Sequence, residues 1–462
     1  MSGEACRDTA RSEKSGAASY VGRAGARDKT RVLPKKSLLD QKNFLAIHHY
    51  NMSLFLIATS GFVALVALLV HFRVTRKITK KRKWRVLWFI VSLISGATFV
   101  WAIRGRRFIQ PVDGTYDFVT IGFCGMTFVA LLVALLVVRD VVLGVGFGVT
   151  WLRRLRRHES DEKTLESAKD ADEEAQKRDG AAVESRRDFL MRVSSLGVLG
   201  GTVVLTPPTI YSAKCRRVIR KTQFVFSKLP AACDGLKIAH LSDIHVGNTI
   251  TRSDVEDMVR ETNALEPDIV VITGDIADGD PQYVVQDLSP LCGLKSRYGA
   301  YYVTGNHEHM WGARGYCQAV AQLGIVVLNN EHRIIDVNGA QLAVAGAIDY
   351  RGDRRERTWQ SDPALALSGI PENVFKLMLV HQPGSVDESL THGADLVLVG
   401  HTHGGQCWPF CYIVDALHKY SRGAYWSGER AVFVSCGTGY WGPPIRLGVP
   451  CEICLHTLKA RG

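Results

Sequence analysis

The sequence predicts an α/β domain from about residue 215 to the end of its 462 residues, preceded by a helical membrane region. From residue 215 onward, short apolar runs alternate with polar, helix-like stretches such as 252–265. That rhythm is typical of buried strands joined by helices. The long apolar blocks, by contrast, lie in the first half of the chain, which predicts membrane helices there.

The formal net charge of +12 is unevenly distributed. Much of it lies in residues 1–50, which are polar and basic and which we expect to form a disordered tail. More of it lies beside the apolar blocks, where basic residues typically flank membrane spans. No basic stripe is interleaved with stacking aromatic residues, so we expect no nucleic-acid partner.

Residues 51–150 predict a three-span transmembrane region. The three apolar blocks are 52–72, 86–103 and 118–138, each close to the length that crosses a bilayer. A basic loop without acidic residues separates the first two blocks, and Arg139 and Asp140 mark the end of the third.

Residues 151–188 are densely charged with both signs and predict a solvated helical linker. Residues 189–210 predict a fourth span or anchor. Arg186 and Arg187 precede Phe189 and an apolar run, a pattern that resembles a twin-arginine export signal. The alternative is a span with an ordinary basic flank.

The positively charged loops predict the orientation of the chain. Basic loops favour the cytoplasmic side, which places residues 73–85 and 152–188 there. Four crossings then make the protein a multi-pass membrane protein whose C-terminal domain is extracytoplasmic. The basic residues 1–50 oppose this orientation, because they would lie outside as well.

The eleven cysteines form no evenly spaced framework, so a disulfide-stapled fold is not expected. Cys407 with Cys411, and Cys451 with Cys454, could pair or bind zinc, but two such pairs are a weak signal without further ligands.

Five apolar runs in the C-terminal half each end in residues that bind metals. The residues that follow these runs are Asp243 and His245; Asp275 and Asp278; Asn306, His307 and Glu308; His381; and His401 and His403. We expect them to meet at one sheet edge, because ligands bind beyond the carboxyl ends of strands in open α/β sheets. Oxygen and imidazole ligands without thiolate suit manganese, iron or zinc. Gly274, Gly305 and Gly400 would let the backbone turn sharply there.

This ordered set resembles the motifs of the calcineurin-like metallophosphoesterase superfamily, in the order D-x-H, G-D-x-x-D, G-N-H-E, H and G-H-x-H. The likeness covers residues 215–462. Together with the apolar first half and the twin arginine, it is similar to a bacterial membrane-associated branch. It implies a catalytic domain built as a four-layer sandwich of two mixed β-sheets flanked by helices. Residues 341–348, 431–435 and 452–458 would supply strands of the second sheet.

The resemblance also implies a role for each site residue. Two divalent metal ions would be held by two groups of side chains, and Asp275 would bridge them. The first group is Asp243, His245 and His403, and the second is Asn306, His381 and His401. His307 would be the catalytic histidine that protonates the departing oxygen. The chain departs from the family's motifs only after Glu308, at His309 and Trp311.

The resulting functional hypothesis is a membrane-anchored phosphoesterase that hydrolyses phosphomonoesters or phosphodiesters with a metal-activated hydroxide. The membrane setting favours a lipid or cell-envelope substrate. The alternatives are a nucleotide or sugar-phosphate substrate, and a membrane sensor with a vestigial catalytic domain. The aromatic residues in 407–412 and 439–446 have three alternative roles. They could contact lipid headgroups, pack in the core, or form a sugar-binding platform. Arg446 would contact phosphate or lie on the surface.

Overall fold

The computed structural model describes residues 65–78, 81–90, 93–94, 115–161, 169–215, 217–247, 249–352 and 359–461. The chain divides into two compact units, 1–61 and 62–462. The first unit lies outside the described residues, and so do the predicted tail 1–50 and most of the predicted spans 52–72 and 86–103.

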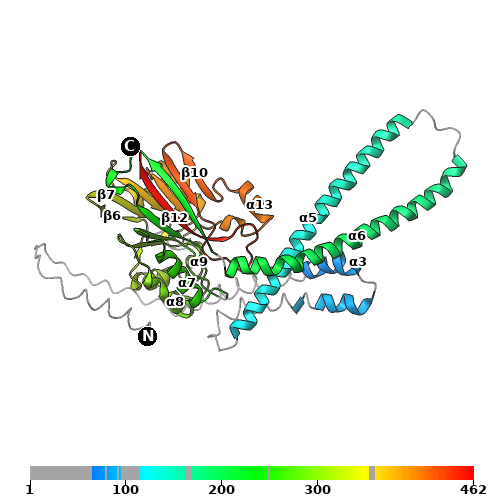
Figure 1. Ribbon diagram of the computed structural model, residues 1–462, viewed down its shortest axis with the longest axis horizontal. Helices are drawn as coiled ribbons and strands as arrows, with labels where there is room; N and C mark the ends of the chain where they lie inside the picture. Colours follow the sequence, from blue (N-terminus) through cyan, green and yellow to red (C-terminus); the bar gives the residue numbers. More distant parts are fainter. Residues whose placement is uncertain are drawn as a thin grey trace, which may run out of the picture. The chain divides into compact units, whose positions relative to one another are not determined.

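Two long helices occupy much of the described N-terminal half (Figure 1). They are α5 (Thr115–Asp161) and α6 (Lys169–Lys214), and the short segments η2 (His71–Thr75) and α3 (Arg76–Ile78) precede them. By length and composition, Thr120–Arg153 and Asp188–Lys214 could each cross a membrane. These stretches overlap the predicted third span and the predicted segment 189–210.

Helix α5 continues through Arg139 and Asp140, although the sequence suggested that the apolar span ends there. Arg139 donates to Oγ of Ser195 at 3.0 Å, and Asp140 pairs with Arg73 at 2.6 Å. Because these charged groups find partners on neighbouring helical segments, the helix does not have to end to expose them to water.

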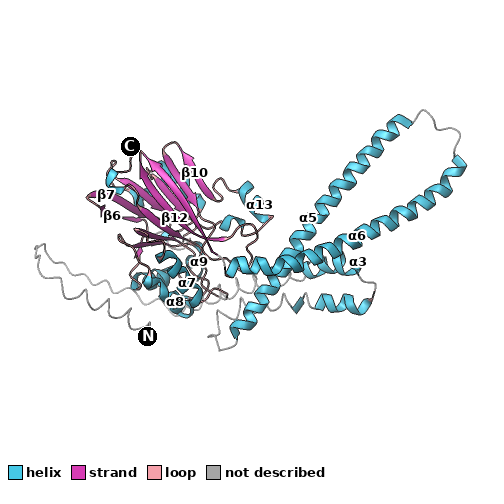
Figure 2. Ribbon diagram, viewed as in Figure 1, coloured by secondary structure: helices cyan, strands magenta, loops and turns pink. Residues whose placement is uncertain are grey.

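The described residues from Arg217 onward build two six-stranded mixed sheets and the helices that flank them (Figure 2). The first sheet has the order β1 (Arg217–Phe226), β12 (Cys451–Ala460), β2 (Lys237–Leu241), β3 (Ile269–Thr273), β4 (Ala300–Val303), β5 (Val326–Val327). The second has the order β10 (Gly423–Ser427), β11 (Arg430–Val434), β9 (Leu396–Val399), β8 (Phe375–Leu379), β7 (Ala340–Gly346), β6 (Glu331–Val337). Most central pairs are parallel, which explains runs such as Ile269–Thr273 that are apolar on both faces.

Three apolar cores give the domain four layers. One core lies between the sheets and joins residues such as Ile238 and Ile269 of the first to Leu377 and Phe433 of the second. The helices α7 (Arg252–Asn263), α8 (Pro281–Leu288) and α10 (Ala313–Gln322) cover the first sheet. The helices α11 (Pro363–Leu367) and α12 (Val386–Thr391) cover the second. Two mixed sheets flanked by helices are therefore the observed fold, as expected.

Two details differ from the sequence-based expectation. Residues 452–458 belong to β12, which lies in the first sheet, parallel to β1 and antiparallel to β2. The prediction that they form part of the second sheet is wrong. The strands that end in metal-binding residues also come from both sheets, since β2, β3 and β4 belong to the first and β8 and β9 to the second. The site therefore lies where the carboxyl ends of strands from both sheets meet.

Candidate metal centre

All eight predicted site residues meet at the carboxyl ends of these five strands. Asp243 and His245 follow β2, and Asp275 follows β3. Asn306 and His307 begin the short helix α9 (Asn306–Trp311) after β4. His381 follows β8, and His401 and His403 follow β9. The polar side chains gather here because each strand stays buried up to its last residue and the chain turns immediately afterwards.

Five of these residues have left-handed backbone conformations. Their φ angles are 52° at Asp243, 54° at His245, 51° at Asp275, 73° at His401 and 51° at His403. Residues other than glycine rarely adopt this region, at a cost of about 1–3 kcal/mol each where the conformation is strained. Strain of this kind concentrates at functional sites, so its presence at five neighbouring positions indicates a site that depends on side-chain placement.

The three glycines at the site have two different roles. Gly274 has a φ of +81° and makes the sharp turn that the sequence predicted. Gly305 and Gly400 do not have positive φ angles. A Cβ atom at Gly305 would collide with the carboxylate of Asp275, and one at Gly400 would collide with the hydroxyl of Ser242. At these two positions the small residue is needed for close approach rather than for a turn.

The first group of candidate ligands is Asp243, His245 and His403, which are all buried and whose donor atoms lie within 4.8 Å of one another. The Nε2 atoms of His245 and His403 are 3.1 Å apart. Nε2 of His403 lies 3.4 Å from Oδ1 of Asp243. These distances suit atoms that surround one cation, because ligands that share an ion lie a few ångströms apart.

The second group combines Asp275, His381 and His401, whose donor atoms also lie within 4.8 Å of one another. Asn306 joins this group, with its Oδ1 atom 3.2 Å from Nε2 of His381. The rings of His381 and His401 are 5.1 Å apart between centroids.

Asp275 lies between the two groups. Its Oδ2 atom is 3.1 Å from Nε2 of His381 in the second group and 3.8 Å from Nε2 of His245 in the first. One carboxylate therefore faces imidazoles of both groups, which is the position of a bridging ligand in a two-metal site.

Hydrogen bonds at Nδ1 prepare two of these histidines for metal binding. The Nδ1 atom of His381 lies 2.7 Å from the carbonyl oxygen of Thr273, and that of His245 lies 3.1 Å from Oδ2 of Asp278. Both partners accept hydrogen bonds, so each Nδ1 carries a proton and each Nε2 is the ring nitrogen that faces the other candidate ligands.

Asp278 has a role that the sequence left open. Its carboxylate contacts Nδ1 of both His245 and His307. The second aspartate of the G-D-x-x-D motif therefore orients one candidate ligand and the catalytic candidate together. The ring of His307 lies edge-on to that of His245, with centroids 4.7 Å apart.

The electrostatics favour neutral rings at His401 and His403 and a charged carboxylate at Asp275. Burial lowers the pKa of His401 to about 3, and burial together with Arg446 holds the pKa of His403 well below its usual value. Both rings are thus neutral at pH 7. Burial alone would raise the pKa of Asp275, but His381 and His307 outweigh it and hold that pKa low.

The donor chemistry fits divalent metal ions. The two groups offer carboxylate and amide oxygens and neutral imidazoles, without thiolate, a set that suits manganese, iron or zinc. Asp243 is buried, and burial raises its pKa. A buried carboxylate is expensive without a cation beside it, which a bound metal would supply.

Two further residues support the site: Glu308, to which the sequence assigned no role, and Ser242, which it did not single out. The carboxylate of Glu308 accepts hydrogen bonds from the backbone N–H groups of Gly305, Asp275 and Ile276 at 2.6–2.9 Å. It thereby ties the loops after β3 and β4 together. The hydroxyl of Ser242 donates to Oδ2 of Asp243 at 2.5 Å.

Arg446 does not lie on the surface, so that sequence-based interpretation of it is wrong. It is only 1% exposed. It donates to the carbonyl oxygens of His403 at 3.2 Å and Gly439 at 2.6 Å, and its Nη2 lies 2.9 Å from Nδ1 of His403. Arg446 thus holds the loop that carries His403. No sequence motif signals such a contact, because the two residues are far apart in the chain.

The other predicted residues belong to neither group of candidate ligands. The ring of His309 packs against Trp359, and its Nε2 lies 3.0 Å from the hydroxyl of Thr304. None of the ten cysteines that the structure describes forms a disulfide bond. Cys454 lies near His240 and His456, while Cys407 and Cys411 belong to separate apolar clusters.

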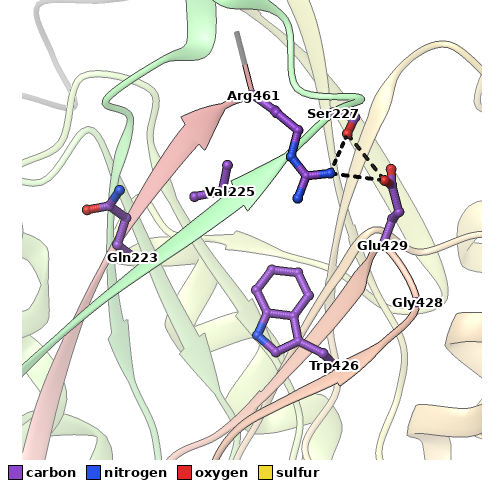
Figure 3. A pocket seen from close by; sticks show the side chains of 7 residues that line it. All are labelled: Gln223, Val225, Ser227, Trp426, Gly428, Glu429 and Arg461. Carbon is purple, nitrogen blue, oxygen red and sulfur yellow. Dashed lines mark hydrogen bonds and ion pairs between the residues drawn. The ribbon is translucent and has the colours of Figure 1, made fainter.

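A cleft of about 400 Å³ lies elsewhere on the domain (Figure 3). Its lining includes Gln223, Trp426 and Arg461, and none of the metal-binding candidates. Since β12 runs antiparallel to β2, its last residues lie at the opposite end of the sheet from Asp243. This cleft is therefore not part of the candidate metal centre.

Comparison with known proteins agrees with the geometry. The family model described as calcineurin-like phosphoesterase matches residues 236–405. An uncharacterized metallophosphoesterase of Helicobacter pylori (strain 26695) is 35% identical over 274 residues, which cover 59% of this chain and 72% of that protein. This chain belongs to the metallophosphoesterase family.

Other relatives of this metallophosphoesterase are animal proteins, so the similarity is not restricted to a bacterial branch. A Caenorhabditis elegans protein named as a metallophosphoesterase is 36% identical over 258 residues, 54% of each chain. A Bos taurus "transmembrane protein with metallophosphoesterase domain" is 34% identical over 270 residues, 56% of this chain and 61% of that protein. The chain thus spans only about half to three fifths of these two relatives. The cattle protein's name and the two apolar helices both point to membrane association.

Proposed function

We propose that this protein is a membrane-anchored phosphoesterase that hydrolyses phosphomonoesters or phosphodiesters with two divalent metal ions. The observation that carries the proposal is the position of Asp275, whose Oδ2 faces His381 at 3.1 Å and His245 at 3.8 Å. Asp243, His245 and His403 would hold one ion, and Asn306, His381 and His401 the other. Two such ions, when bound, neutralise charge on phosphate oxygens and activate a water molecule for attack.

His307 supplies the proton for the departing oxygen. Burial alone would lower its pKa, but Asp275 and Asp278 outweigh that effect and raise it to about 10. The ring is thus protonated at pH 7. Because Asp278 holds Nδ1, the proton available to substrate is the one on Nε2, which lies 3.8 Å from Oδ2 of Asp275. A proton donor fixed beside the bridging carboxylate is suited to general acid catalysis.

The membrane setting favours a lipid or cell-envelope phosphoester as the substrate. Thr120–Arg153 and Asp188–Lys214 would anchor the chain, and the loop charges favour a multi-pass, extracytoplasmic arrangement of the catalytic domain. A nucleotide or sugar-phosphate substrate is the second candidate within the same chemistry. The buried, oriented ligand set favours an enzyme over a sensor with a vestigial domain.

The test is metal analysis of the purified full-length chain together with hydrolysis of bis-p-nitrophenyl phosphate and p-nitrophenyl phosphate. We expect two divalent ions per chain and hydrolysis that is lost on chelation and restored by added metal. A chain that binds no metal and hydrolyses neither ester after incubation with manganese, iron or zinc would instead support the sensor alternative.

A further inference from the structure

The helix α13 (Phe410–Leu417; Figure 1) follows the loop that carries His403. The face that it exposes is the opposite of the one that a helix of a water-soluble domain usually exposes. Its exposed side chains are apolar: Phe410 is 45% exposed, Tyr412 61%, Ile413 53% and Leu417 75%. A surface helix normally turns such a stripe toward the core and its polar face toward water. Here the apolar face is the outer one.

The polar group of α13 faces the protein instead. Asp415 is only partly exposed, and its Oδ2 accepts a hydrogen bond from Arg422 at 2.7 Å. Cys411 packs inward against Cys436 and Val449. A contiguous exposed apolar patch is uncommon on proteins surrounded by water and marks a contact surface.

The patch adjoins the metal centre. Gln406 immediately follows the loop that carries His403. Its Nε2 donates to the carbonyl oxygen of Trp441 at 3.0 Å, and its Oε1 accepts a hydrogen bond from the backbone N–H of Trp441 at 2.8 Å. Trp441 is 53% exposed, and its ring lies 5.9 Å from that of His307 between centroids. The apolar helix therefore packs against the loop that carries His403, and this tryptophan lies next to the proposed catalytic histidine.

The same region is continuous with an apolar helix that is long enough to cross a membrane. Leu131 of α5 packs against Cys407, which precedes α13, and against Ile445. The hydroxyl of Thr127 donates to the carbonyl oxygen of Pro444 at 3.2 Å. At ~1.5 Å per residue, Thr127 lies about 10 Å inside the apolar stretch Thr120–Arg153. The segments that flank α13 and Trp441 thus lie along the apolar stretch, not beyond its end.

We propose that α13 lies in the interface of a lipid bilayer, with Phe410, Tyr412, Ile413 and Leu417 among the acyl chains and Trp441 at the headgroup level. Short helices with one apolar face bind membrane interfaces in this way, and tryptophan concentrates at the boundary with water. The metal centre then opens onto the phosphate groups at the bilayer surface. The inference rests on the proposed function only in that the chain is membrane-anchored.

The test uses the full-length chain in nanodiscs of phosphatidylethanolamine and phosphatidylglycerol. A photoreactive benzoylphenylalanine replaces Ile413 or Leu417 in separate variants. The matched control carries it at Leu365 of α11, an apolar residue that is 54% exposed on another helix. After illumination, mass spectrometry measures the fraction of each variant that carries a lipid adduct.

We expect adducts at positions 413 and 417 to exceed those at position 365 by at least tenfold. Equal yields at all three positions would overturn the inference, and so would cross-links at 413 and 417 to a second protein chain instead of lipid. Hydrolysis of bis-p-nitrophenyl phosphate is measured in the same samples. Retained hydrolysis without lipid adducts refutes the membrane contact alone, whereas lipid adducts without metal or hydrolysis refute the proposed function alone.

Discussion

Oδ2 of Asp275 lies 3.1 Å from Nε2 of His381 and 3.8 Å from Nε2 of His245. The carboxylate is only 2% exposed, so it cannot exchange these partners for water. It therefore lies close to imidazoles of both candidate ligand groups. Its replacement is therefore the most informative single change at the site.

Asp275→Asn removes the negative charge and one of the two metal-binding oxygens while keeping the size of the side chain. We expect the metal content to fall from two ions per chain to one or fewer, and the hydrolysis of bis-p-nitrophenyl phosphate to fall by at least about 10³-fold. The control is Asp280→Asn on the same loop, since Asp280 caps helix α8 outside the site. An Asp275→Asn protein with two ions and wild-type turnover would refute the bridging role.

His307→Ala removes the proton donor without removing a proposed metal ligand. Metal content should stay at two ions per chain, while turnover of an alkyl phosphoester falls by about 10²–10⁴-fold. A nitrophenyl ester needs less help from an acid, because its leaving group is a weak base. The loss for bis-p-nitrophenyl phosphate should therefore be much smaller. Equal losses for both esters would show that His307 does not act as the acid.

Asp278→Asn tests how His307 is held. The carboxylate contacts Nδ1 of His307 and, together with Asp275, raises the pKa of that ring. We expect the basic limb of the pH–rate profile to move to lower pH in the variant, because the ring loses its proton more readily. An unchanged profile in metal-loaded protein would contradict this positioning role.

Arg446→Met removes the donors that hold the carbonyl oxygen of His403 while preserving much of the side-chain volume. Partners that orient metal ligands typically contribute 10–100-fold to metal affinity. We expect the variant to lose metal to a chelator at a correspondingly lower concentration. Arg333→Met, on the exposed strand β6, is the control. Identical chelator titrations of the two variants would show that Arg446 does not support the site.

The buried pair His240 and His456 predicts a loss of stability in acid. The two rings lie 3.4 Å apart, His456 Nε2 to His240 Nδ1, and neither is exposed. Burial lowers the pKa of His240 to about 3 and holds that of His456 well below its usual value. The unfolded chain binds these protons from about pH 6.5 downward. The contribution of the two neutral rings to the free energy of unfolding is thus complete above pH 6.5. It is lost as the pH falls toward 3, at about 1.4 kcal/mol per pH unit for each ring.

Thermal unfolding of the metal-free protein between pH 7 and 5 measures this effect. His456→Gln should flatten the fall of the unfolding temperature with pH, because one group no longer takes up a proton on unfolding. His392→Gln, at an exposed position, should leave the slope as it is in the wild-type chain. Equal slopes in all three proteins would contradict the assignment.

The sequence predicted which side chains would come together because each follows a buried strand, and strand ends determine where such residues meet. It could not predict that β12 would insert between β1 and β2, since strand pairing across more than 200 residues depends on packing between the sheets. The roles of Arg446 and Asp278 were likewise hidden, because their partners adjoin them only after folding. Of the membrane region, the structure describes the third predicted span and the segment 189–210, whereas the first two spans lie largely outside the described residues.

The most direct test of the central claim is anomalous diffraction from crystals of the manganese-loaded full-length chain. Two anomalous peaks about 3.5–4 Å apart, with the carboxylate of Asp275 between them, are the predicted result. The first peak should adjoin Asp243, His245 and His403, and the second should adjoin Asn306, His381 and His401. A single peak, or two peaks of which neither touches Asp275, would contradict the account.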